Sequence, residues 1–192
     1  LRCCYLHRSL NQLLDLQVLF LLQAAISILM IITFRPRFSV TPFWMFSATQ
    51  GTPHNERKIV TFRSTASVQN WVVNLDANQV KYPGCDGCMV HQGFYNGFLG
   101  VESYVRQNVQ SLLSTYRGAK IYVTGFSLGS ALAVFGALDL KQIFGHVDEF
   151  YSFGQPRVGN EYFTNFFTQQ ISTHSRVIHY ADIVPHLPPL TL

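Results

Sequence analysis

The sequence predicts an α/β fold, in which a largely parallel sheet carries helices on both faces. Stretches typical of strands alternate with stretches typical of helices along most of the chain. At 192 residues the chain is long enough for one domain with a sizeable core. Its composition, 14% aromatic and 12% charged, is too apolar for a disordered protein. The net charge of +4 comes from scattered residues without a basic cluster, which argues against nucleic-acid binding.

An apolar N-terminal segment, residues 1–40, differs in composition from the domain expected at 41–192. Residues 18–32 are apolar apart from Gln23 and Ser27. This run is shorter than the roughly 20 residues of a membrane-spanning helix, yet it exceeds most signal-peptide cores. We expect a signal peptide or signal anchor, with a buried helix of the domain and a gene-model artefact as the alternatives.

The remaining elements follow from periodicity and turn residues. Strands are expected at 43–49, 58–63, 121–123, 149–154 and 176–181. Helices are expected at 94–116 as one long amphipathic helix, from 128 onward, and at 161–171, with a helical turn around Trp71. Asp182 lies just past the end of the last predicted strand.

The motif Gly125-Phe126-Ser127-Leu128-Gly129 joins a predicted strand to a predicted helix. A G-x-S-x-G sequence in this setting is typical of a nucleophile elbow, a sharp turn that strains the serine backbone. The flanking glycines allow neighbouring backbone to pass close by. A helix that begins at Leu128 directs free amides and its positive dipole end at any oxyanion that forms there.

Four segments, in order along residues 58–188, resemble those of the class 3, fungal-type triacylglycerol lipases, which have the α/β-hydrolase fold. They are Phe62-Arg63-Ser64-Thr65 with Asn70-Trp71, then Val90-His91-Gln92-Gly93-Phe94, the Ser127 motif, and 153–160 with 182–188. The resemblance implies a serine ester hydrolase of lipid catabolism that acts on acylglycerols at a lipid or membrane surface, without a cofactor or metal ion. The competing hypothesis is a catalytically dead or truncated lipase-like scaffold that binds lipids or membranes.

The resemblance also assigns residues to roles. Ser127 is the nucleophile and Asp182 the acid that orients a catalytic histidine. The Leu128 amide and Thr65 form the oxyanion hole, and Trp71 matches the position of the lid. The alternatives are an ordinary turn aspartate at Asp182, a capping threonine at Thr65 and a fixed core helix around Trp71.

Three residues depart from the usual pattern of the family without removing a catalytic group. Phe126 replaces a histidine before the nucleophile. Ser130 and Ser64 each replace a glycine. Both serines add atoms close to the expected oxyanion hole.

A larger departure concerns the catalytic histidine, which in the family lies tens of residues beyond the acid, whereas this sequence stops at Leu192. His91 resembles a structural histidine of the family, and His179 and His186 are poor substitutes for the base. We therefore expect a C-terminally truncated piece of a longer enzyme, with its last sheet elements missing, or a weakly active relative. The 192 residues by themselves should be close to inactive.

Cys85, Cys88 and His91 form a C-x2-C-x2-H pattern. Zinc needs a fourth ligand, and no second pair of ligands lies at finger spacing. Since the family is often secreted, a disulfide between Cys85 and Cys88 is the preferred interpretation. The protein is accordingly expected to be secreted or membrane-associated.

Overall fold

A computed structural model describes residues 45–50, 57–62, 64 and 78–189, all within one compact unit, Pro42–Leu192. The apolar run 18–32, Thr65 and Trp71 lie outside the described residues. In the part of the chain that is described, no helix is long and apolar enough to cross a membrane.

A five-stranded sheet in the order β1-β2-β5-β6-β7 organises the fold. Its strands are β1 (Met45–Gln50), β2 (Arg57–Phe62), β5 (Lys120–Phe126), β6 (Glu149–Phe153) and β7 (His174–Val177). β1 runs antiparallel to β2, and the other neighbours are parallel. The predicted mostly parallel sheet is therefore confirmed, and its central strand, β5, leads directly to Ser127.

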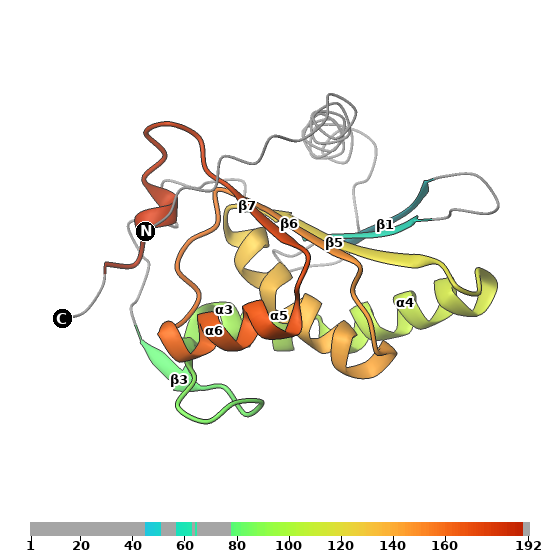
Figure 1. Ribbon diagram of the computed structural model, residues 1–192, viewed down its shortest axis with the longest axis horizontal. Helices are drawn as coiled ribbons and strands as arrows, with labels where there is room; N and C mark the ends of the chain where they lie inside the picture. Colours follow the sequence, from blue (N-terminus) through green and yellow to red (C-terminus); the bar gives the residue numbers. More distant parts are fainter. Residues whose placement is uncertain (1–44, 51–56, 63, 65–77, 190–192) are drawn as a thin grey trace, which may run out of the picture. The chain divides into compact units, whose positions relative to one another are not determined.

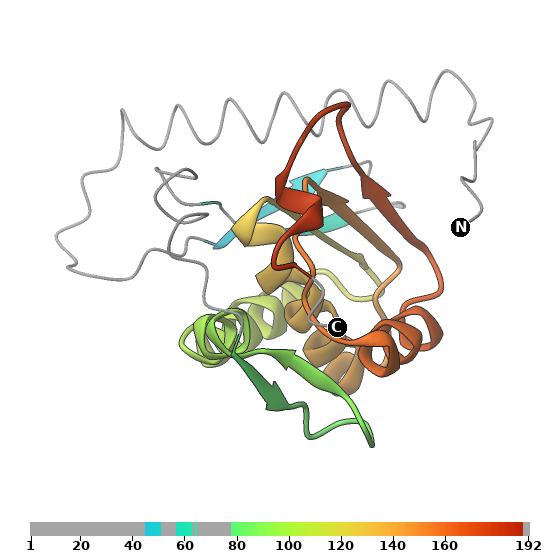
Figure 2. The same cartoon turned by 90° about the vertical axis from the view of Figure 1, so that its left-hand side faces the viewer.

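Four helices lie together on one face of this sheet (Figures 1 and 2). They are α3 (Gln92–Leu99), α4 (Glu102–Thr115), α5 (Leu128–Phe144) and α6 (Glu161–Gln170). The helices expected on the opposite face are not among the residues that the structure describes. The prediction of α6 at 161–171 is correct to within one residue.

Helix α5 forms the centre of the core, and every residue from Leu128 to Leu140 is buried. Its small residues bring the helix close to the sheet. A Cβ on Gly136 would lie 2.6 Å from Cζ of Phe62, a β2 side chain that is 1% exposed. The close approach fixes the height of α5, and therefore of Ser127 at its start, above the sheet.

The long helix predicted at 94–116 is wrong, because the structure has two helices there. α3 ends at Leu99, with Gly100 as its C-cap, and α4 begins at Glu102. Val101, with φ −121° and ψ −4°, departs from helical backbone and separates the two helices. The apolar spacing continued across the break because Phe98 of α3 and Val105 of α4 both face the same core.

The last predicted strand, 176–181, is also displaced, since β7 occupies His174–Val177. Its register with β6 pairs Phe150 with His174 and Phe153 with Val177. Because β7 ends where β6 ends, Ile178 has no strand beside it to continue the pairing. The hairpin of β3 (Gln79–Lys81) and β4 (Met89–His91) was not predicted, since its strands have only three residues each.

The close contact between Gly136 and the Phe62 ring can be tested by substitution. Gly136→Val should lower the free energy of unfolding by about 1–3 kcal/mol, because the added methyl groups collide with the Phe62 ring. Ile143→Val, at a position on α5 that is 45% exposed, is the control and should change it by less than about 0.5 kcal/mol. Urea unfolding measures both, and equal small effects would show that Phe62 moves aside freely.

Candidate active site

Ser127 forms the turn between β5 and α5 with φ 53° and ψ −125°. Few residues other than glycine adopt positive φ, because it strains the backbone. The Ser127 amide donates to the Phe153 carbonyl at 2.9 Å, and the Ser127 carbonyl accepts from the Ser130 amide at 3.0 Å. The expected strained turn is therefore present, and hydrogen bonds on both sides hold it in place.

Gly125 allows two backbone segments of the motif to come into contact. A Cβ on Gly125 would lie 2.5 Å from the carbonyl carbon and oxygen of Gly129, so no side chain fits there. Ser130, one of the departures from the family pattern, takes part in the turn, because its hydroxyl donates to the Ser127 carbonyl at 2.5 Å. The tight connection brings the start of α5 against the end of β5.

The Ser127 hydroxyl is buried, with 2% of the residue exposed, and Oγ has no hydrogen-bond partner among the described residues. A buried hydroxyl without a partner costs about 1–3 kcal/mol. No side chain caps the N-terminus of α5. The Leu128 amide and the positive end of the helix dipole are therefore placed beside the serine, as an oxyanion site requires.

Asp182 reaches the end of β6, the strand next to β5. Gly154 follows β6 with φ +55°, and a Cβ on it would lie 2.8 Å from Asp182 Oδ2 and 3.7 Å from the Phe126 ring. Asp182 Oδ1 accepts a hydrogen bond from the Val184 amide at 3.0 Å. The structure thus brings Ser127 and Asp182 to adjacent strand ends, with the aspartate oriented by a turn.

The described histidines do not hydrogen-bond to Ser127 Oγ. His91 is 6% exposed and caps α3, where Nδ1 accepts from the Phe94 amide at 3.2 Å and the two rings stack at 3.9 Å. This is a structural role, as expected. His179 lies in the exposed loop after β7, and His186 is exposed at the end of a 3-10 turn, η1 (Val184–His186).

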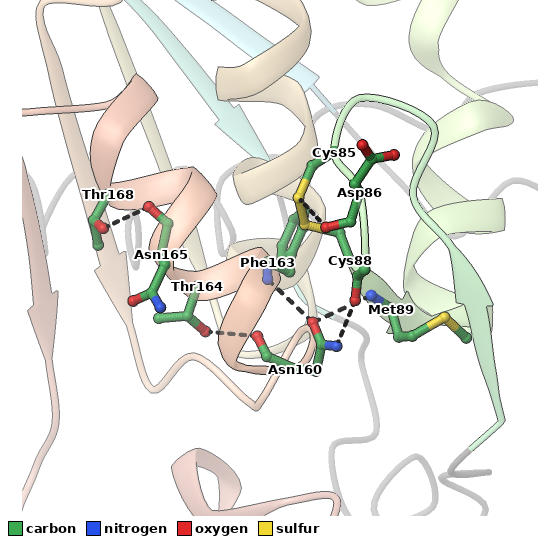
Figure 3. Close-up of a disulfide and its surroundings, with 10 residues drawn as sticks. Cys85, Asp86, Cys88, Met89, Asn160, Phe163, Thr164, Asn165 and Thr168 are labelled. Carbon is green, nitrogen blue, oxygen red and sulfur yellow. Dashed lines mark hydrogen bonds between the residues drawn. A yellow bond between two sulfur atoms is a disulfide. The ribbon is translucent and has the colours of Figure 1, made fainter.

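Cys85 and Cys88 form a disulfide in the turn between β3 and β4, as predicted (Figure 3). Asn160, which caps α6, ties this turn to the helix. Its Oδ1 accepts from the Phe163 and Met89 amides at 3.1 and 3.2 Å, and its Nδ2 donates to the Gly87 carbonyl at 2.8 Å. Across the described ranges, no cluster of His, Cys, Asp or Glu has the arrangement of a metal site.

Sequence reasoning missed the roles of Gly154 and Asn160. The signal for Gly154 was a glycine directly after a buried strand, where backbone with positive φ is common. The signal for Asn160 was an asparagine before Glu161 at the start of a predicted helix. Neither signal indicates the distant partner, which is Asp182 for Gly154 and the disulfide turn for Asn160.

The chain was compared with protein families and with known proteins. The family model described as lipase (class 3) matches residues 59–192. The secreted mono- and diacylglycerol lipase 1 of Fusarium solani is 38% identical over 138 residues, which cover 71% of this chain and 41% of that protein. A lipase of Rhizomucor miehei is 37% identical over 134 residues, covering 68% and 37%.

Solved structures agree with this match. The crystal structure of a lipase from Rhizopus microsporus var. chinensis has a TM-score of 0.77 at 26% identity and covers 95% of this chain and 71% of that one. A fungal lipase–inhibitor complex has a TM-score of 0.67 at 33% identity, covering 77% and 59%. The chain spans about two fifths of the length of the two curated relatives.

The packing of Asp182 on Gly154 predicts a double-mutant result. Gly154→Ala should destabilise the fold through both its positive φ and the collision with the carboxylate. Gly118→Ala is the matched control, because Gly118 has φ +75° and open space around it. It should cost about 1–2 kcal/mol from the backbone alone.

The excess cost of Gly154→Ala over Gly118→Ala should disappear when Asp182→Ala is added, because the carboxylate is then absent. Urea unfolding of the single and double variants measures this coupling. Equal costs for the two glycine variants would show that the carboxylate moves away without loss of stability.

Proposed function

We propose, because the chain belongs to the class 3 lipase family, that Ser127 is the nucleophile of a serine ester hydrolase. The observation that carries this proposal is the strained turn at φ 53°, where a buried hydroxyl without a partner meets the uncapped start of α5. Strained residues of this kind cluster at functional sites. The positive φ distinguishes Ser127 from Ser152, whose buried hydroxyl also lacks a partner but which lies in the regular strand β6.

The chemistry is acyl transfer in two steps. Ser127 Oγ attacks the ester carbonyl carbon and passes its proton to a histidine. The carbonyl oxygen becomes an oxyanion that accepts from the Leu128 amide, with Thr65 as the proposed second donor. The histidine then returns the proton to the leaving alcohol, and water cleaves the acyl-enzyme in the same way.

Asp182 is the proposed acid that holds the histidine in the required tautomer. Its carboxylate is half-buried and is oriented by the Val184 amide and by Gly154. The histidine itself is not assigned, because none of the described histidines hydrogen-bonds to Ser127 Oγ.

Acylglycerols are the proposed substrates, in keeping with the relative named as a secreted mono- and diacylglycerol lipase. Apolar side chains around the candidate site support a lipid surface as the place of action. Phe126, Ile178 and Ile183 are 39%, 46% and 61% exposed. Trp71 remains the proposed lid residue, from its place in the family pattern, and a lid of this kind would open at a lipid surface to admit substrate.

Secretion is proposed from the same relative and from the disulfide, which forms and persists in oxidising compartments.

The alternative function, an inactive scaffold that binds lipid, is favoured by one observation. Ser127 Oγ hydrogen-bonds to no histidine in the described part of the chain. Reactivity of Ser127 decides between the two functions.

A fluorophosphonate probe should label Ser127 in the complete natural protein, and Ser127→Ala should abolish labelling. Ser152→Ala is the matched control, since Ser152 is also buried with an unpartnered hydroxyl but lies within β6. This variant should keep wild-type labelling. Mass spectrometry of the labelled peptide gives the site, and an unlabelled Ser127 in a folded protein would favour the inactive scaffold.

A further inference from the structure

The segment after Asp182 does not provide hydrogen-bond donors for all of its own backbone carbonyls. Pro185, Pro188 and Pro189 have no N–H group. The two hydrogen bonds within the 3-10 turn η1 use the carbonyls of Ile183 and Val184 as acceptors. The carbonyls of residues 185–188 therefore receive no hydrogen bond from within the turn.

Arg157 and Arg176 supply donors to all four of these carbonyls. Arg176 Nη2 donates to the Pro185 carbonyl at 3.0 Å. The Arg157 amide donates to the Leu187 carbonyl at 2.7 Å. Arg157 Nη1 donates to the His186 carbonyl and, at 2.8 Å, to the Pro188 carbonyl.

Arg176 also contacts the segment on the other side of Asp182. Arg176 Nη2 also donates to the Gln155 carbonyl at 2.7 Å. Gln155 follows Gly154, the residue against which Asp182 Oδ2 packs. Asp182 Oδ1 accepts from Val184, the first residue of the turn that the arginines hold. Both contacts of the carboxylate thus lie on segments that Arg157 and Arg176 tie together.

We propose that Arg157 and Arg176 are positioning residues for the Asp182 carboxylate, acting as a clamp on residues 185–188. The proposal rests on the proposed function of Ser127 and Asp182. The clamp holds the turn, the turn fixes the Val184 amide, and that amide sets the direction in which the carboxylate faces. A small displacement of the acid is enough to impair catalysis, because the histidine must be held in one orientation.

The chemistry of the clamp requires guanidinium groups. One planar guanidinium directs several N–H donors in fixed directions, whereas a lysine ammonium is a flexible point charge. In the described part of the chain, the ion pairs do not include Arg157 or Arg176, so their donors go to carbonyls rather than to carboxylates. Burial, and then the charge of Arg157, lower the pKa of Arg176, but arginine remains protonated at neutral pH.

Arg106 provides a matched control for a purely structural arginine. Its side chain donates to both Asp139 carboxylate oxygens, at 3.0 and 2.5 Å, and to Glu102 at 2.6 Å. These contacts tie α4 to α5 and do not involve residues 182–188. If a loss of stability were the only effect of the substitutions, Arg106→Met would lower kcat as much as Arg157→Lys and Arg176→Lys.

The test compares Arg157→Lys, Arg176→Lys and Arg106→Met in the complete natural protein, well below each melting temperature. We expect both lysine variants to lower kcat for a short-chain ester by about 10–100-fold, with KM nearly unchanged. The acid limb of the kcat/KM profile should move about 0.5–1 pH unit lower, since a displaced Asp182 stabilises the charged histidine less well. Arg106→Met should leave kcat and the limb unchanged.

Amide hydrogen exchange separates failure of the clamp from failure of the proposed function. Exchange at Val184, Leu187 and His186 should rise in the two lysine variants and not in Arg106→Met, whether or not Ser127 is reactive. Unchanged exchange at these amides would overturn the proposal. If Ser127 is reactive, an unchanged acid limb of the kcat/KM profile in both lysine variants would also overturn the proposal. The arginines would then have a structural role only.

Discussion

The left-handed backbone of Ser127 is the constraint on which the candidate site depends. Such a conformation costs about 1–3 kcal/mol, and the buried hydroxyl without a partner adds a similar cost. Both are large against a typical folding free energy of about 5–15 kcal/mol. The turn persists because β5 pairs on both sides, α5 is buried along its first thirteen residues, and the Ser127 amide bonds to Phe153.

The remainder of the site follows from how parallel strands end. β5, β6 and β7 point the same way, so their carboxyl ends meet at one edge of the sheet. Ser127, Gly154 and Asp182 all lie along that edge. Glycines at 125 and 154 are needed because backbone or a carboxylate occupies the space that a side chain would take. The strands hold this edge by their pairing, and hydrogen bonds from Arg157 and Arg176 join the proline-rich segment 183–189 to it.

Local sequence patterns predicted much of this arrangement. The Ser127 turn, β2, β6, α6 and the Cys85–Cys88 disulfide depend on neighbouring residues, and each was predicted. The break at Gly100 was missed because α3 and α4 face one core and keep a common apolar spacing. The end of β7 depends on the length of β6, and the partners of Arg157 lie 29 and 31 residues away. Such long-range contacts leave no periodic signal in the sequence.

The structure of a covalent phosphonate adduct tests the central claim most directly, because the adduct imitates the tetrahedral intermediate at the serine. The account predicts a bond from phosphorus to Ser127 Oγ and a phosphoryl oxygen about 2.7–3.1 Å from the Leu128 amide nitrogen. A phosphonate attached to another side chain would contradict it. So would an adduct on Ser127 whose phosphoryl oxygen makes no contact with the Leu128 amide.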